Sequence, residues 1–219
     1  MSTPSLTATS YAVLGLLAIK PWSSYELTQQ MDRSLGRIWP RAVSKLYEEP
    51  KKLVARGLAR SSAEHNGRRT RTIYAITDQG RQALAAWLQE PGAGPVLEFE
   101  QLVKVFFADS ATKADTLASL RAAQEWAQAQ CTASLAVAEQ YAHEEGPFPQ
   151  RTLRLQLTSR FPTDFYLLVF DWARWATAIA ETWPDDPSNA RADPQVTAET
   201  IRRASIGAHG HRNRNRKQP

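Results

Sequence analysis

Residues 40–77 read PRAVSKLYEEPKKLVARGLARSSAEHNGRRTRTIYAIT, and this stretch decides the fold. Its first half has the period of an amphipathic helix that begins near Pro40, since proline suits the first turn, and ends at Gly57. The predicted apolar stripe consists of Val43, Leu46, Tyr47, Pro50, Leu53 and Val54. The opposite face carries Arg41, Ser44, Lys45, Glu48 and Lys52. The pattern predicts a helix with one face on a core and a largely basic face in solvent.

The second half of the stretch changes to period two. Strand candidates at Leu58–Ser62 and Thr72–Ile76 are separated by the turn signal His65-Asn66-Gly67. Thr77 then caps a helix that extends to about Gln89, with Leu84, Trp87 and Leu88 expected to face inward. This part of the chain therefore predicts a β-hairpin followed by a helix.

Two further helices precede the stretch. The first covers about Ser10 to Ile19, and Pro21 ends it. Ser23 and Glu26 form a capping box that starts the second, which buries a stripe of Leu27, Met31 and Leu35. Helix, helix, helix, hairpin is the order of a winged helix-turn-helix.

The segment Pro91-Gly92-Ala93-Gly94-Pro95 predicts a domain boundary, and the residues after it read as helices. A helix is expected at Glu98–Asp109, and Thr112 with Asp115 forms a capping box for a long helix towards His143. Its seam is predicted at Leu117, Leu120, Gln124, Ala127, Cys131, Ser134, Ala138 and Tyr141. A second seam is predicted at Phe161, Phe165, Leu168, Trp172, Trp175, Ile179 and Thr182.

The expected fold is thus mainly α with a small β-hairpin: an N-terminal winged helix-turn-helix and a C-terminal helical, coiled-coil-like dimerisation domain. The predicted domains are residues 1–90, 96–183 and a mostly disordered basic tail at 184–219, with at most one short helix near Ala198–Ser205. The two helices that carry these seams can bury one face each by packing against each other. A symmetric homodimer is the simplest way to bury the apolar surface that remains.

Composition narrows the class of protein. The longest apolar run, Tyr11–Ile19, is too short to cross a bilayer, Met1–Thr9 is polar, and Cys131 is the single cysteine. These features favour a cytoplasmic location. Residues 1–90 hold thirteen Lys and Arg against seven Asp and Glu, whereas residues 91–211 hold ten against fifteen. A basic head on an acidic body suggests a polyanion as partner.

The candidate contacts are to double-stranded DNA. Arg41, Ser44 and Lys45 are donors on the helix that would enter the major groove, and base edges require such groups. Arg68, Arg69 and Arg71 at the hairpin are candidates for contacts to phosphates or to the minor groove, and Lys52 is a candidate for phosphate contacts. The alternative is a helical interaction module whose basic head binds an acidic protein.

The chain resembles the PadR family of bacterial transcription regulators. The resemblance rests on Tyr25-Glu26-Leu27, Ser44-Lys45-Leu46-Tyr47, Arg56-Gly57-Leu58, the run from Arg71 to Arg81, and Leu97-Glu98-Phe99-Glu100 on to Phe107. It covers roughly residues 10–183. It implies a winged-helix head, a helical dimerisation domain, palindromic operators and repression that a small ligand relieves. By position it also implies that Tyr47 lies on the DNA-facing helix.

The sequence departs from the family at one place. The family usually has proline directly after the tyrosine and leucine two residues further on, where this chain has Glu48 and Pro50. Pro50 cannot donate to the carbonyl of Leu46, so the helix is expected to kink there, or to end at Glu48 or Glu49 and restart. As part of the apolar stripe, Pro50 is also expected in the core.

Aromatic residues are frequent in the second half of the chain and suggest a site for a small aromatic effector. Phe106, Trp172 and Trp175 are the candidate lining, and ordinary heptad packing is the alternative. Enzyme chemistry has no support: the chain lacks a serine elbow, a phosphate-binding glycine loop and paired carboxylates in a plausible pocket. No cofactor or metal site is expected, and His209 and His211 are read as incidental.

Overall fold

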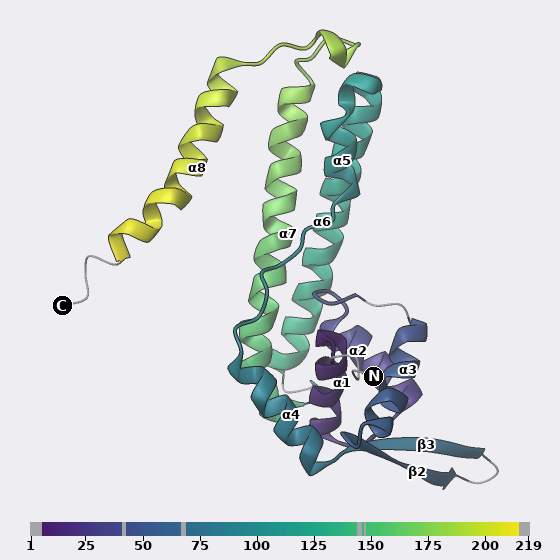
Figure 1. Cartoon of the computed structure of the whole chain (residues 1–219). Coiled ribbons are helices and arrows are strands. Elements are labelled where there is room, and N and C mark those ends of the chain that lie inside the picture. The colour runs from purple at the N-terminus through teal and green to yellow at the C-terminus, as the bar shows by residue number, and fades with distance from the viewer. Residues whose placement is uncertain (1–5, 41–42, 67–68, 144–145, 147, 215–219) are drawn as a thin grey trace, which may run out of the picture. The chain divides into compact units, whose positions relative to one another are not determined.

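The computed structural model describes residues 6–40, 43–66, 69–143, 146 and 148–214 (Figure 1). The chain forms two compact units, Met1–Val96 and Leu97–Pro219, which we call the head and the helical unit. Each is described by itself.

The described residues of the head form four helices and a three-stranded antiparallel sheet. In chain order its elements are α1 (Ala8–Ile19), β1 (Trp22–Ser23), α2 (Ser24–Leu35), α3 (Val43–Ala55), β2 (Ala59–Asn66), β3 (Arg69–Ile76) and α4 (Asp78–Gln89). The sheet order is β1-β3-β2, so the predicted hairpin gains a short third strand, in which Trp22 pairs with Tyr74. The mainly helical fold with a small sheet is confirmed.

Local signals set the ends of these elements. The capping box of Ser23 and Glu26 is present, and Thr77 caps α4 by accepting a hydrogen bond from the Gly80 N–H. Gly57 ends α3 with a φ of 70°, a conformation that favours glycine. The Leu58 N–H bonds back to the carbonyl of Leu53, as in a Schellman motif, so the chain turns directly from α3 into β2.

The core of the head lies between the three N-terminal helices and the sheet. Its fully buried side chains include Val13, Leu14, Leu17, Leu27, Met31 and Leu53. On α4, Trp87 and Leu88 are exposed rather than buried as predicted, although the Trp87 ring stacks on Tyr11 with centroids 4.8 Å apart. The core thus holds α1, α2 and α3 against the sheet.

The helical unit is built around two long helices. Its elements are α5 (Glu100–Phe106), η1 (Ala108–Ser110), α6 (Lys113–Ala142), η2 (Pro149–Arg151), α7 (Thr152–Ala180), η3 (Pro187–Asn189) and α8 (Pro194–Arg214). The predicted capping box of Thr112 and Asp115 starts α6. At the same end, the Lys113 ammonium donates to the carbonyls of Glu181 and Trp183, so α6 and α7 are antiparallel.

Small residues form the contact between α6 and α7. The buried cluster consists of Ala123, Ala127, Val169 and Ala173. Leu120 and Ala127 lie on the predicted seam of α6, but the buried face of α7 is offset by one residue from the predicted seam, at Pro162, Tyr166, Val169, Ala173 and Ala180. The prediction for α7 was wrong by one residue, because small side chains form the centre of the contact between the helices, whereas Phe165 and Trp172 of the predicted seam pack against its edge.

The C-terminal segment differs from its prediction as a mostly disordered tail. Residues Pro194–Arg214 form the single helix α8, longer than the expected short one near Ala198–Ser205. Asp193 begins it, since its side chain accepts from the Gln195 N–H and its carbonyl from the Thr197 N–H. The residues that follow include several good helix formers, and these favour a helix despite the polar composition of the segment.

Among the described residues, none of the helices combines the length and the apolar character that a membrane span requires.

Candidate nucleic-acid interface

Helix α3 has one buried and one exposed face. Leu46, Glu49, Pro50 and Leu53 are buried in the head. The exposed side chains on the described part of the helix are those of Lys45, Tyr47, Glu48, Lys51, Lys52 and Ala55. Tyr47 therefore lies outside the apolar stripe on which its spacing placed it, and Glu49 takes a place within the stripe. The exposed face presents three lysines, a tyrosine and one carboxylate.

Pro50 lies inside α3 without ending it. The helix is continuous from Val43 to Ala55, so the alternative in which it ends at Glu48 or Glu49 and restarts is wrong. The Pro50 ring is fully buried, as expected for a core residue. Burial of the ring offsets the hydrogen bond that proline cannot donate to Leu46.

A buried carboxylate joins α3 to α1. Glu49 accepts a hydrogen bond of 2.8 Å from the Ser10 hydroxyl, and its other oxygen lies 3.1 Å from the Lys52 ammonium. Lys52 is also 3.8 Å from Glu48. Since its charge is shared between two acids, Lys52 is less available for phosphate than its position in the sequence suggested.

The wing consists of β2, β3 and their connection. Arg71 on β3 pairs with Glu64 across the strands, and its guanidinium is 2.7 Å from that carboxylate and 3.5 Å from Glu26 on α2. The hydrogen bond and the charge of Glu64 raise the pKa of Arg71 above its ordinary value. Arg71 thus links the distal half of the wing to α2, in contrast to the expectation of a side chain offered to phosphate.

The carboxylate of Glu26 has two tasks in this arrangement. It accepts hydrogen bonds from the backbone N–H and the hydroxyl of Ser23, at 2.9 and 2.7 Å, and it faces Arg71. The backbone bond, then the hydroxyl bond, and to a smaller extent Arg71 lower the pKa of Glu26. The start of α2 and the wing are therefore held by one ionised side chain.

The structure brings part of the predicted set together. Lys45, Tyr47 and Lys52 are exposed along α3. Arg41 and Arg68 lie outside the described residues; for Ser44 and Arg69 the backbone is described, in α3 and β3, but the side chain is not.

Sequence reasoning missed Lys51. Positions 44, 48, 51 and 55 lie at i, i+4, i+7 and i+11, directly opposite the buried face, so Lys51 is at the centre of the exposed one. A helical wheel drawn with Glu49 in place of Tyr47 on the buried side would have identified it.

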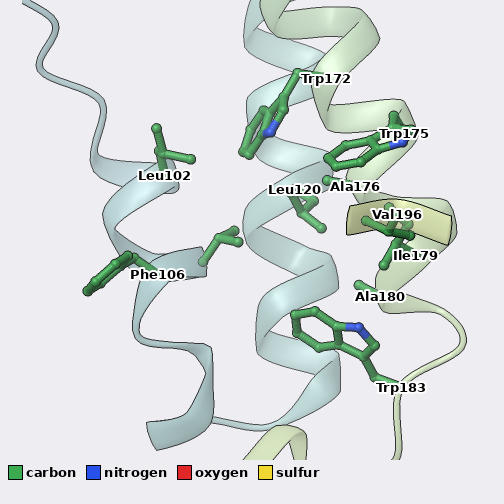
Figure 2. Close-up of a pocket in the computed structure, with 11 residues that line it drawn as sticks. Leu102, Phe106, Leu120, Trp172, Trp175, Ala176, Ile179, Ala180, Trp183 and Val196 are labelled. Carbon is green, nitrogen blue, oxygen red and sulfur yellow. The ribbon is translucent and has the colours of Figure 1, made fainter. Parts of the chain in front are cut away.

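The helical unit contains a pocket of about 480 Å³ between α5, α6, α7 and the start of α8 (Figure 2). The three residues predicted for an effector, Phe106, Trp172 and Trp175, all line it. The remaining lining is Leu102, Val105, Leu120, Ala176, Ile179, Ala180, Trp183 and Val196. As far as the structure describes the chain, the only side-chain polar atoms in this lining are the indole nitrogens, so the pocket suits an apolar ligand.

Comparison with known proteins agrees with this architecture. Residues 13–86 match the family model of the transcriptional regulator PadR-like family. The chain is 32% identical over 99 residues to the negative transcriptional regulator PadR of Bacillus subtilis, and 33% identical over 85 residues to Rv1176c of Mycobacterium tuberculosis, described as a probable transcriptional regulator. These alignments cover 44% and 38% of this chain, and 54% and 45% of the relatives, so the chain spans about half the length of each.

Solved structures match over a longer stretch. Bacillus subtilis PadR in complex with operator DNA superposes with a TM-score of 0.68 at 23% identity, and covers 80% of this chain and 99% of its own. The same protein in complex with p-coumaric acid matches with a TM-score of 0.62 at 22% identity, over 80% of this chain and 99% of that one. The PadR-like regulator BC1756 of Bacillus cereus matches with a TM-score of 0.66 at 17% identity, over 79% of this chain and 98% of that one. At these identities the matches establish the fold.

The fold defines a winged-helix protein with a helical second unit. The head matches the PadR-like family of transcriptional regulators, which the sequence resembles, and the solved PadR structures share the fold. The family that the head matches consists of transcriptional regulators.

Proposed function

We propose that the protein is a dimeric, sequence-specific DNA-binding regulator that represses transcription from a pseudo-palindromic operator. The observation that carries the proposal is the geometry of α3, whose buried face anchors it in the head and whose exposed face presents Lys45, Lys51 and Lys52. A single helix fits the major groove of B-DNA, and polar side chains on its exposed face reach base edges.

The other cationic side chains would contact phosphates of the DNA backbone. We assign Arg41, Ser44, Lys45 and Tyr47 to the groove, and Lys52 and the wing arginines Arg68, Arg69 and Arg71 to phosphates. Within this set, the ion pairs of Lys52 and Arg71 make them the weaker phosphate partners. The relative from Bacillus subtilis supports the assignment of function, since it is a negative regulator and was solved with operator DNA.

Dimerisation is supported by the apolar surface that α7 leaves uncovered. Leu157, Phe161 and Leu168 are each at least 60% exposed and lie on the stripe beside the buried face. A second copy of the same stripe would bury them by a two-fold contact. The dimer would place two α3 helices in successive major grooves, about 34–36 Å apart.

An effector is proposed for the pocket of the helical unit. Its volume of about 480 Å³ is within the usual range for small-molecule sites, and its tryptophans offer flat surfaces for an aromatic ring. A relative was solved with p-coumaric acid, which is an aromatic carboxylic acid. Binding of such a compound is proposed to release the operator.

Footprinting of genomic fragments, followed by gel shift with a salt titration, tests the main proposal. We expect a protected pseudo-palindrome, and affinity that falls on the order of a thousandfold between 50 and 200 mM salt. A protein that protects no DNA segment but captures an acidic protein would contradict the proposal and favour the alternative of an interaction module.

A further inference from the structure

Glu48 is the carboxylate on the exposed face of α3. Of the two acids in this helix, Glu49 is buried and Glu48 has 66% of its side chain exposed. Position 48 lies opposite the buried face formed by Leu46, Glu49, Pro50 and Leu53, in the second turn of the helix. If α3 docks into a major groove by its exposed face, position 48 is among the positions turned towards the DNA.

The ion pair of Glu48 does not explain why an acid is placed there. Its oxygen is 3.8 Å from the Lys52 ammonium, which is closer, at 3.1 Å, to Glu49. Exposed pairs of this kind contribute little to stability. The Glu48 side chain is therefore free to turn towards another donor.

A carboxylate beside DNA also carries a cost, because phosphates repel it. An ionised glutamate has acceptors only, and in the major groove it pairs with the N4 amino group of cytosine. Guanine and thymine present O6 and O4 acceptors at the corresponding place, so the same carboxylate disfavours them. An acid on this face therefore lowers the affinity of the protein for DNA of any sequence, and it raises the discrimination between bases at one position.

We propose that Glu48 is a specificity-determining residue that accepts a hydrogen bond from the amino group of one cytosine in each half-site of the operator. This inference rests on the proposed function, since it requires α3 to lie in the major groove. Lys45 and Lys51 on the same face attract the negatively charged DNA, and Glu48 determines which base is preferred.

The test is selection of binding sites from randomised duplexes with the full chain, followed by affinity measurements on the selected site and on variants of each position. Wild type is compared with Glu48→Ala and Glu48→Gln. The control is Glu90→Gln, which removes one negative charge at an exposed position at the end of α4 on the same unit. Circular dichroism of each variant establishes that the head is folded.

For wild type we expect a cytosine at one position of each half-site, with about a fivefold or larger loss of affinity on replacement by any other base. Glu48→Ala should lose this preference and bind the four variants of that position within about twofold of one another. Glu48→Gln should shift the preference towards adenine, because an amide pairs with the N6 and N7 of adenine. Glu90→Gln should keep the wild-type preference.

Two results would overturn the inference while leaving the proposed function intact. One is a Glu48→Ala variant that binds every sequence more tightly by the same factor, as expected of an acid that only repels phosphate. The other is a variant with unchanged preference at every position. If wild type itself selects no sequence and binds no duplex, the proposed function fails as well.

Discussion

The hydroxyl of Ser10 donates a buried hydrogen bond of 2.8 Å to the carboxylate of Glu49, and this bond joins the first helix of the head to α3. Ser10 also completes a capping box with Thr7 at the start of α1. The start of α1 and the placement of α3 are thus coupled through one serine. Because α3 carries the proposed DNA contacts, the pair links the stability of the head to its function.

Replacement of Ser10 by alanine is expected to destabilise the head by about 1–3 kcal/mol, since it removes a hydrogen-bond donor from a buried carboxylate. Urea unfolding followed by circular dichroism measures this. Ser34→Ala is the control, since the Ser34 hydroxyl donates to the Gln30 carbonyl at an exposed site of α2. A double-mutant cycle with Glu49→Ala separates the pair from the capping box, and a coupling energy near zero would show that the contact is not stabilising.

Arginines of the wing are expected to differ in their contribution to DNA binding. Replacement of Arg68 and Arg69 by alanine should weaken binding to all sequences alike and reduce the slope of log affinity against log salt. Arg71→Ala should reduce this slope less, because its guanidinium is paired with Glu64 and Glu26. Gel shifts between 50 and 200 mM salt give the slopes, and equal reductions for Arg69→Ala and Arg71→Ala would contradict the expectation.

The dimer proposal predicts a position-dependent effect of charge on α7. The double variant Phe161→Glu and Leu168→Glu places carboxylates in the proposed contact and should give a species of 24.5 kDa, half the mass expected of wild type, by light scattering. Gln156→Glu introduces a charge at another exposed position of α7 and should remain dimeric. A monomeric wild type would exclude the proposed dimer.

The pocket of the helical unit should prefer uncharged aromatic ligands. Since its described lining offers no cation, the methyl ester of p-coumaric acid should bind more tightly than the carboxylate itself at neutral pH. Quenching of tryptophan fluorescence reports binding. Ala176→Phe fills the pocket and should abolish quenching, whereas Ala178→Phe, at an exposed position of α7, should not. Failure of both compounds to bind, or to loosen operator binding, would contradict the effector proposal.

A pH dependence follows from the lowered pKa of Glu26. Its ionised form is favoured in the folded head, so its contribution to stability is full above the ordinary value of 4.5 and is lost as the pH falls through the lowered value. Wild type should therefore be more stable than Glu26→Gln at pH 6, and the difference should shrink below pH 4.5. Urea midpoints at several pH values test this; a difference that does not change with pH would exclude ionisation as its cause.

Short-range signals in the sequence were enough to predict most of the secondary structure. The capping boxes of Ser23 and Thr112, the glycine at position 57 and the change from helical period to period two marked the elements of the head and the start of α6. Such signals act within a few residues, so the chain reveals them without reference to the fold. The family resemblance rested on the same local motifs.

Tertiary structure decided what local patterns leave open. Spacing alone placed Tyr47 inward and left Glu49 unassigned, and only the partner Ser10 on another helix explains why the acid is buried. The seam of α7 was offset by one residue because alanines on two distant segments fit together more closely than the larger side chains beside them. Burial depends on contacts between parts far apart in the chain, and hydrophobicity along one helix does not contain that information.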